Sequence, residues 1–524
     1  MIPTVLLEQL YVLGPHCDLG HVVLHHLLCV CRYAVAAKAL RAGETVLSER
    51  PFVLAPHSDS ALVCFCCHLP LVSRFLVCKG CGVAPVCPEP CPEIFENWHS
   101  KPECDLFKSM RESRGLSAMN VVPHVGALAV LRALLQRRQN PQAWADFARL
   151  ETHMAQRRGT AVYTYNQQTV KFIESLGLVG PDDEPELVQT ACAAIDVNSF
   201  EVRGPRAPLG GETLRGVFLA AALLAHDCVP NAHMAVGDHN LLVCHASRDI
   251  DEGDPIYYSY TDLMKGTALR QEHLLNGKYF KCACSRCCDS TELGTYMSST
   301  ICPECKGYVS NAGDKWSCHS CSKEFDAATM SHKVQCCSDK LDVINKRDEK
   351  ELEEYIKNVS LVLAPNHYLL LDAKQRLAGV LRDTITREPR PTKRLLRRQL
   401  TLCREILTVL EVITPGISRA KAIALYEIHA AMVQLAKKLF DSREITGSEY
   451  LDELTSAEKH LKRSLEMLFI EPGNSPEGEL CAKALQEYRA LKETMNGVLD
   501  GIHADGKTYV SAAQKELQTC PTVL

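Results

Sequence analysis

Apolar residues follow two different spacings along this chain of 524 residues. A strand pattern covers Tyr33 to Ala37 and again Thr45 to Leu54, with a turn at Arg41-Ala42-Gly43-Glu44 between them. Short strands return between Asp196 and Tyr260. Residues 1–30 show no clear pattern and predict either a strand or no regular element. The pattern therefore predicts a β-rich region that begins near residue 31.

Helical spacing interrupts this region and then replaces it. Residues 107–195 predict mainly helices, including an amphipathic one marked by Val125, Leu128, Leu131 and Leu135. After about Lys340 the chain predicts long helices with few breaking residues. Helix ends and starts are indicated by Pro415-Gly416, Ser418 and Ser475-Pro476. These helices predict an array of antiparallel pairs without a strict repeat, followed by a loose tail over about the last 20 residues.

Composition points to a soluble protein inside the cell. The formal net charge of −5 favours neither nucleic acid nor membrane as a partner. The longest apolar run, Gly216 to Ala225, is about half of what a membrane helix needs. No Lys or Arg precedes Arg32, so the basic region of a secretory signal is missing. In a reducing compartment the 27 cysteines indicate zinc sites rather than disulfides.

The first cysteine cluster has the spacing of metal ligands in four pairs. Seven cysteines and one histidine are enough for two tetrahedral zinc sites, and Cys66 is predicted to be a bystander. The pairs are Cys64 with Cys67, Cys78 with Cys81, Cys87 with Cys91, and His99 with Cys104. Between Cys64 and Phe107, three Lys or Arg residues stand against five acidic ones, whereas phosphate binding needs clustered positive charge. We therefore expect a protein-binding finger and no direct DNA binding.

A second cysteine-rich segment follows the β-rich region. Cys282, Cys284 and Cys287 provide three ligands and need a fourth to close a structural site. Two further pairs, Cys302 with Cys305 and Cys318 with Cys321, are separated by twelve residues and have the spacing of a zinc ribbon. Cys288, Cys336 and Cys337 are expected to be bystanders.

Several short motifs give the chain a specific resemblance. They are Asn198-Ser199-Phe200, the run from His226 to Asn231, the run from Ile256 to Asp262, and Lys278-Tyr279-Phe280-Lys281-Cys282. With Arg32 to Pro51 and the first cysteine cluster, they resemble the SET and MYND (SMYD) lysine methyltransferases over most of residues 31–325. The ribbon is similar to that of the arthropod-specific branch.

The resemblance implies an α+β fold, in which a MYND finger splits a β-rich SET domain and a TPR-like helical array ends the chain. The implied parts are a divergent N-terminus (1–30), a first SET segment (31–63), the MYND zinc finger (64–104), a helical insert (105–195), the core SET domain (196–277), a post-SET segment with zinc ribbon (278–330), the helical array (340–500) and a tail (501–524).

The resemblance also implies how the zinc ions are shared. One MYND ion takes Cys64, Cys67, Cys87 and Cys91, and the other takes Cys78, Cys81, His99 and Cys104. Cys228 completes the post-SET site of Cys282, Cys284 and Cys287. The ribbon adds a fourth ion. The last His and Cys of the finger are four residues apart here, where the family usually has three, so distortion of that site or replacement of His99 stays open.

The implied reaction is methyl transfer from S-adenosylmethionine to a protein lysine. A free Lys needs about 4.6 kcal/mol to lose its proton at pH 7, and a narrow apolar channel lowers that cost by desolvating the ammonium. By resemblance, Tyr260 is the catalytic tyrosine, and Phe200 and Tyr258 form the channel wall. The implied cofactor contacts are Arg32, Tyr33, Asn198, His226, Tyr260 and Phe280, with Phe280 stacking on the adenine.

Two departures from the family leave a second function open. Cys31 stands where a glycine usually lets the backbone approach the cofactor. Ala225 replaces the first Asn of its motif, and the loss of one buried hydrogen bond costs about 1–3 kcal/mol. The alternatives are a catalytically weak or inactive scaffold, which recruits protein partners through the finger and the helical array, and a nucleic-acid-binding zinc protein.

A run of basic residues in the array is either a solvated face, a dock for an acidic segment or a weak nuclear-import signal. These are Arg387, Arg390, Lys393, Arg394, Arg397 and Arg398.

Overall fold

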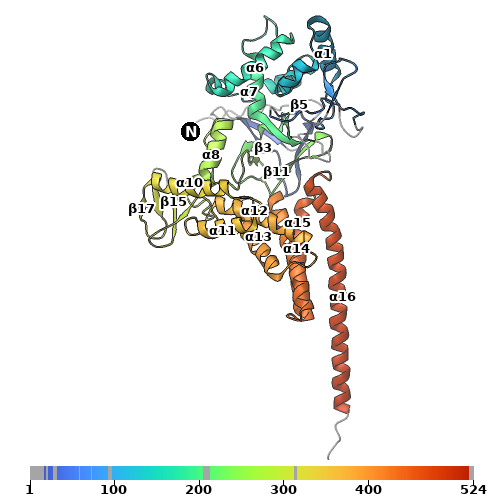
Figure 1. Ribbon diagram of the computed structural model, residues 1–524, viewed down its shortest axis with the longest axis vertical. Coiled ribbons are helices and arrows are strands. Elements are labelled where there is room, and N and C mark those ends of the chain that lie inside the picture. Colours follow the sequence, from blue (N-terminus) through green and yellow to red (C-terminus); the bar gives the residue numbers. More distant parts are fainter. Residues whose placement is uncertain are drawn as a thin grey trace, which may run out of the picture. The chain divides into compact units, whose positions relative to one another are not determined.

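The computed structural model describes residues 17–18, 22–26, 32–57, 59–71, 74–91, 97–204, 213–311 and 315–518 (Figure 1). The chain folds into two compact units. Unit 1 comprises residues 1–226, 231–258 and 272–281, and unit 2 comprises residues 227–230, 259–271 and 282–524. Cys31, the first departure from the family pattern, lies outside the described residues.

Unit 1 contains small sheets rather than one continuous sheet. One has the order β1-β4-β12-β11 and another β5-β9-β8, while β2-β3, β10-β13 and β6-β7 are pairs. Every pairing is antiparallel except the parallel pair of β10 with β13. The strands are β1 (Cys17–Asp18), β2 (Val22–His26), β3 (Arg32–Ala36), β4 (Thr45–Glu49), β5 (Val53–Pro56), β6 (Leu76–Val77), β7 (Pro85–Val86), β8 (Ser199–Arg203), β9 (Thr213–Val217), β10 (Ala225–His226), β11 (Ala232–Val236), β12 (Leu242–Ala246) and β13 (Tyr257–Tyr258).

The first strands show how local sequence sets the sheet edges. Glu44 N–H donates to Arg41 C=O at 3.0 Å, and Gly43 has the positive φ of 88° that this turn requires. The predicted strand from Thr45 to Leu54 is wrong as one element, because it is divided into β4 and β5 around Pro51. Proline has no N–H to donate to a neighbouring strand, so the ladder ends there.

Helices of unit 1 form an insert between β7 and β8. They are α1 (Lys101–Arg114), α2 (Ala118–Val121), the 3-10 helix η1 (Val122–Ala127), α3 (Leu128–Gln139), α4 (Pro141–Ala148), α5 (Met154–Arg157), α6 (Ala161–Ser175) and α7 (Leu187–Asn198). Two short 3-10 helices, η2 (Ala221–Leu223) and η3 (Asp238–Asn240), lie among the later strands. Residues of α8 (Thr267–Lys278) belong in part to each unit.

α3 corrects the prediction of an amphipathic helix. Every residue from Leu128 to Leu135 is buried, because α3 contacts β5 as well as α1, α4 and α7. Pro123 and the non-helical backbone of His124 separate α2 from α3. Residues 118–139 are together long and apolar enough to cross a bilayer, but 67% of their most apolar window is buried inside the protein. They serve as the centre of a hydrophobic core.

Unit 2 combines a small sheet with a helical array. The sheet β14-β15-β16-β17 is an antiparallel meander made of Thr300–Ile301, Tyr308–Asn311, Trp316–Cys318 and Glu324–Phe325. The helices are α9 (Ser285–Cys288), α10 (Ala327–Val343), α11 (Glu349–Val359), α12 (Tyr368–Arg387), α13 (Lys393–Ile413), α14 (Arg419–Asp441), α15 (Gly447–Leu468) and α16 (Pro476–Gln518). From α11 to α16, each helix contacts the next, as short connections predict (Figure 1).

The end of the chain differs from the prediction of a loose tail after residue 500. α16 begins at Pro476, with the Ser475 hydroxyl accepting from Gly478 N–H at 3.0 Å, and continues to Gln518. Once a helix has started, each added residue gains a backbone hydrogen bond without a new nucleation cost. A polar sequence rich in Ala, Lys and Glu is therefore enough to continue it, despite Gly501 and Gly506.

Candidate functional site

Sixteen Cys and His side chains form four groups that could each hold a metal ion. In every group the four ligand atoms lie within 4.8 Å of one another. The groups are Cys64, Cys67, Cys87 and Cys91; Cys78, Cys81, His99 and Cys104; Cys228, Cys282, Cys284 and Cys287; and Cys302, Cys305, Cys318 and Cys321. They are the four sets that the spacing and the resemblance predicted.

Distances within these groups fit tetrahedral zinc. Sulfurs on one zinc ion, with Zn–S bonds of about 2.3 Å, lie about 3.8 Å apart. The observed Sγ–Sγ distances are 3.7 Å for Cys64 and Cys91, 3.5 Å for Cys67 and Cys87, 3.8 Å for Cys78 and Cys104, 3.6 Å for Cys228 and Cys287, and 3.9 Å for Cys302 and Cys321. A disulfide would bring two sulfurs to about 2.0 Å, so these thiolate sets fit metal and not disulfides.

His99 keeps its place in the second finger site in spite of the four-residue spacing. Its Nε2 lies 3.6 Å from Cys81 Sγ, and its Nδ1 lies 2.7 Å from Glu103 Oε1. This pairing of a carboxylate with the far nitrogen of a metal-binding histidine orients the ring and makes it a better ligand. Glu103 is one of the five acidic residues counted between Cys64 and Phe107, and its side chain is fully buried.

Arg132, on α3, completes this buried network. Its Nε donates to Glu103 Oε2 at 2.9 Å, and its terminal nitrogens donate to Leu54 C=O at 2.6 Å and Phe65 C=O at 3.0 Å. Burial alone would raise the pKa of the Glu103 carboxyl, but Arg132 and His99 outweigh it and lower that pKa below its ordinary value. Sequence reasoning missed Arg132, whose signal is the single charged residue within the apolar run from Leu128 to Leu135.

Four of the predicted cofactor and channel residues cluster in unit 1. β10 and β13 pair in parallel, with His226 opposite Tyr258. The ring centroids of His226 and Phe280 are 5.9 Å apart, and those of Phe200 and Tyr258 are 6.2 Å apart. All four side chains are half-buried, and Phe200 and Tyr258 also pack against the hydrophobic core that contains Phe218.

The backbone beside this cluster is strained. Tyr279 has a φ of 61°, which is rare for a bulky residue. Its ring lies 5.0 Å from the His153 ring, and its hydroxyl accepts from Arg157 at 3.4 Å, whereas Phe280 is paired with His226. The left-handed backbone at Tyr279 turns the chain, so the adjacent rings of Tyr279 and Phe280 contact different partners. Strain of this kind occurs often at functional sites. Sequence reasoning did not single out Tyr279 or His153.

Two asparagines hold the segments around the cluster. Asn231 accepts from Tyr257 N–H at 2.7 Å and donates to Pro255 C=O at 2.9 Å, so it ties the β10 motif to β13. The Asn198 amide donates to Ala194 C=O at 2.7 Å and Glu151 C=O at 2.8 Å. These bonds make Asn198 a link to the helical insert, and its cofactor contact stays a prediction. Asn231 was quoted in the motif but given no role.

Three other predicted residues lie on β3 or shortly after β13. Arg32 and Tyr33 begin β3, which contacts β10. Tyr260 is half-buried and follows β13 by two residues, in unit 2. Their contacts with a cofactor stay predictions.

A cavity of about 340 Å³ lies in unit 1, apart from the predicted cofactor residues. In its wall, the carboxylate of Asp196 forms ion pairs with two arginines. Its oxygens lie 2.5 Å from a terminal nitrogen of Arg157 and 3.4 Å from one of Arg215. Asn198, His226 and Phe280 are absent from the described residues that line it.

The chain is similar to known proteins that contain a SET domain. A family model described as the SET domain matches residues 32–261. "SET domain-containing protein SmydA-8, isoform A" of Drosophila melanogaster is 27% identical over 361 residues, which cover 66% of this chain and 74% of that protein. A SET and MYND domain-containing protein of Dictyostelium discoideum is 25% identical and covers 52% of this chain and 60% of its own length. "Histone-lysine N-methyltransferase ASHR2" of Arabidopsis thaliana is 25% identical over 49% of this chain and 69% of its own length.

Proposed function

Because residues 32–261 match the SET-domain family model and the chain is similar to SET and MYND domain proteins, we propose that it is a member of that family and an S-adenosylmethionine-dependent protein-lysine N-methyltransferase. The observation that carries the proposal is the half-buried aromatic cluster in which His226 and Tyr258, on the β10–β13 pair, are joined by Phe280 and Phe200. It lies within the segment that matches the SET domain, except for Phe280, which follows it.

The residues of the cluster fit the two ligands of such a reaction. A half-buried phenylalanine face suits an adenine ring, so Phe280 is assigned to cofactor binding together with the backbone of His226. When bound, the cofactor supplies the reactive methyl group. Phe200 and Tyr258 are assigned to the wall of the lysine channel. Their rings exclude water and lower the cost of deprotonating the ammonium, which is about 4.6 kcal/mol at pH 7 in water.

Tyr260 is assigned as the catalytic tyrosine. Its hydroxyl is an acceptor and donor suited to the lysine amine and to the methyl-bearing end of the cofactor. The reaction is a direct displacement, so the role of the chain is to align the amine rather than to form a covalent intermediate. Arg32, Tyr33 and Asn198 are assigned to the cofactor's polar groups.

The four cysteine groups are assigned to four zinc ions: two in the finger, one after the SET segment and one in the ribbon. All-sulfur and S₃N donor sets of four ligands suit structural zinc, with no open position for catalysis. The intracellular location expected from this cysteine use is part of the same proposal.

One observation favours a second candidate function. Ala225, on β10 beside His226, replaces the first Asn of its motif, and the alanine side chain offers no hydrogen bond to a cofactor. A scaffold with weak or no activity would then recruit proteins through the finger and the helical array.

Titration calorimetry of the zinc-loaded protein with S-adenosylmethionine tests the proposal. We expect micromolar binding by the wild type and binding weaker by about 5- to 150-fold in Phe280→Ala, because stacking of a base on an aromatic ring contributes about 1–3 kcal/mol. Phe469→Ala, at a 60% exposed phenylalanine of unit 2, is the matched control and should bind as the wild type does.

The same titration separates the two functions. Equal binding by the wild type and Phe280→Ala would contradict the assigned adenine site. No binding by the wild type, with binding restored in Cys31→Gly, would contradict the enzyme and support the scaffold. If binding is present, a peptide array with labelled cofactor then identifies the lysine substrates.

A further inference from the structure

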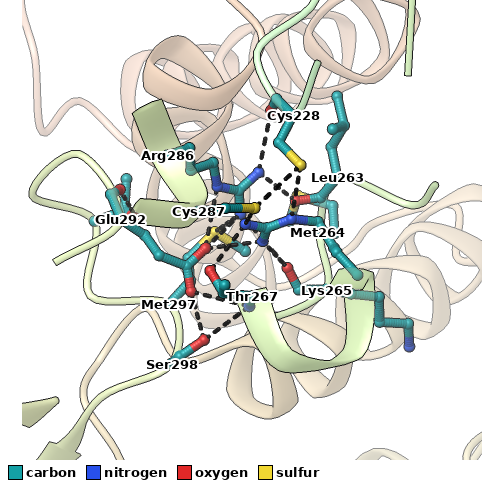
Figure 2. Close-up of polar contacts among 12 residues, drawn as sticks. Cys228, Leu263, Met264, Lys265, Thr267, Arg286, Cys287, Glu292, Met297 and Ser298 are labelled. Carbon is teal, nitrogen blue, oxygen red and sulfur yellow. Dashed lines mark hydrogen bonds and ion pairs between the residues drawn. The ribbon is translucent and has the colours of Figure 1, made fainter. Parts of the chain in front are cut away.

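Two arginines are buried beside the metal group that contains Cys228. Arg270, on α8, and Arg286, on α9, have fully buried side chains, and both form ion pairs with the buried Glu292 (Figure 2). Oε2 of Glu292 lies 2.8 Å from Arg270 and 2.9 Å from Arg286. One carboxylate therefore faces two guanidinium groups, and one positive charge is left to be balanced.

The thiolates of the metal group supply the missing negative charge. Arg270 Nε donates to Cys228 Sγ at 3.3 Å, and its terminal nitrogen donates to Cys287 Sγ at 3.6 Å. A zinc ion with four thiolates has a net charge of −2, which balances the guanidinium charge that Glu292 leaves unpaired. A buried charge is stable only where it has such a partner.

The same guanidinium groups hold the loop that connects β13 to α8. Arg286 donates to Leu263 C=O at 3.0 Å, and Arg270 donates to Lys265 C=O at 2.5 Å and to the Thr267 hydroxyl at 2.9 Å. Figure 2 shows Arg286 between Glu292, Cys228 and the segment that starts at Leu263. The two arginines thus link the metal group to the loop.

The loop is also closely packed. Glu292 accepts from Thr267 N–H at 3.3 Å and from the Ser298 hydroxyl. A Cβ at Gly266 would lie 2.6 Å from Ser298 Oγ and 2.8 Å from Tyr368 Cδ1, so only glycine fits there without a shift. These hydrogen bonds and close contacts fix the loop in one conformation. Several of the hydrogen bonds come from the two arginines, so the conformation depends on them.

We propose that Arg270 and Arg286 are positioning residues that couple metal occupancy of the Cys228 group to the placement of the 261–267 loop. This inference rests on the proposed function in one respect: the loop begins directly after Tyr260, so zinc acts on methyl transfer by fixing the catalytic tyrosine. Loss of the metal removes the charge that holds the arginines and releases the loop.

The first experiment measures how fast each cysteine of the zinc-loaded full chain reacts with N-ethylmaleimide, by peptide mass spectrometry. In Arg270→Met we expect Cys282, Cys284 and Cys287 to react about 10- to 100-fold faster than in the wild type, as is typical when a partner of a metal ligand is removed. The ribbon cysteines should react at an unchanged rate. Arg419→Met, which removes a guanidinium paired with Glu471 at 2.7 Å in the helical array, is the matched control and should change neither rate.

The second experiment measures amide hydrogen exchange in residues 261–268. In the wild type, exchange should accelerate when a chelator removes zinc. In Arg286→Met it should already be fast with zinc bound. Unchanged exchange in both cases would overturn the proposal, as would a wild-type labelling rate in Arg270→Met.

Arg270→Lys covers the case in which Arg270→Met does not fold. It keeps the positive charge but lacks the planar fork that reaches both the thiolates and the loop. Faster exchange of the loop with zinc still bound would support positioning by the guanidinium, and wild-type exchange would refute it. Neither readout needs cofactor or substrate, so a failure here is distinct from a failure of the methyltransferase assignment.

Discussion

At the scale of single residues, the buried carboxyl group of Glu49 holds the segment that leads to His226. Its carboxylate is 4% exposed and accepts from the N–H groups of Ala220 and Ala221 at 3.0–3.1 Å. These residues begin the segment that leads to His226. Burial raises the pKa of Glu49 to about 7, although the backbone donors act in the opposite direction.

This raised pKa predicts a stability that falls with pH. Between pH 4.5 and 7 the folded state holds the Glu49 proton and the unfolded state does not, so the free energy of unfolding decreases as pH rises through this window and is level above it. The change is about 3 kcal/mol. Urea unfolding at pH 5 and pH 8 should show this difference in the wild type, and Glu49→Gln should lack it. The same pH difference in both proteins would contradict the assignment.

At the scale of elements, Arg132 joins parts of unit 1 that are far apart in sequence. From α3 it reaches Glu103 on α1, Leu54 on β5 and Phe65 in the finger. The finger, the first strands and the insert therefore share one buried polar network. A network of this kind is stable only while every member has its partner.

Removing Arg132 should therefore destabilise more than one element. Arg132→Met leaves Glu103 buried without its cation, and we expect a loss of about 3–5 kcal/mol in the free energy of unfolding of unit 1. Faster maleimide labelling of Cys78, Cys81 and Cys104 should accompany it, because Glu103 orients His99. Lys101→Met removes the exposed ion pair with Asp105 on the same α1 and should cost less than about 1 kcal/mol. Equal effects of the two variants would show that the buried network has no special role.

At the scale of the whole molecule, metal and hydrophobic packing stabilise different parts. None of the four metal groups found in the described residues takes a ligand from α11 to α16. These helices have hydrophobic cores of their own, such as the one around Leu454, Leu461 and Leu468. The finger, in contrast, consists of short segments around metal ligands, where structural zinc can supply about 10–16 kcal/mol of folding free energy.

Chelation should therefore unfold the protein in parts. With a strong chelator at neutral pH, we expect residues 64–104 and the ribbon to lose protection from hydrogen exchange. Amides of α12 to α15 should stay protected, and most of the helical circular dichroism should remain. Simultaneous loss of protection in the finger and in these helices would contradict separate stabilisation.

Spacing alone identified the metal-binding pairs and most of the helical array, while the resemblance implied how the pairs share ions and that Cys228 completes the third group. Pairs such as Cys64 with Cys67 are neighbours in sequence, so their chemistry and their separation are visible without a fold. The same holds for Leu402, Ile406, Val409 and Ile413, which repeat at helical intervals and are all buried. Such patterns can be interpreted from sequence alone because the residues that interact are close together in the chain.

Tertiary structure decided what depends on residues far apart in the chain. The contacts of Arg132 with Glu103 and Leu54 span 29 and 78 positions of the chain, and those of Arg270 with the two thiolates span 42 and 17. No periodicity in the sequence indicates such contacts. The length of α16 depends on helix propagation through a polar sequence, and the division of β4 from β5 depends on the strand pairing that Pro51 interrupts. The sequence alone therefore determined which residues could bind metal, and only the fold decided which buried charges hold them in place, because a buried charge is stable only where the fold provides its partner.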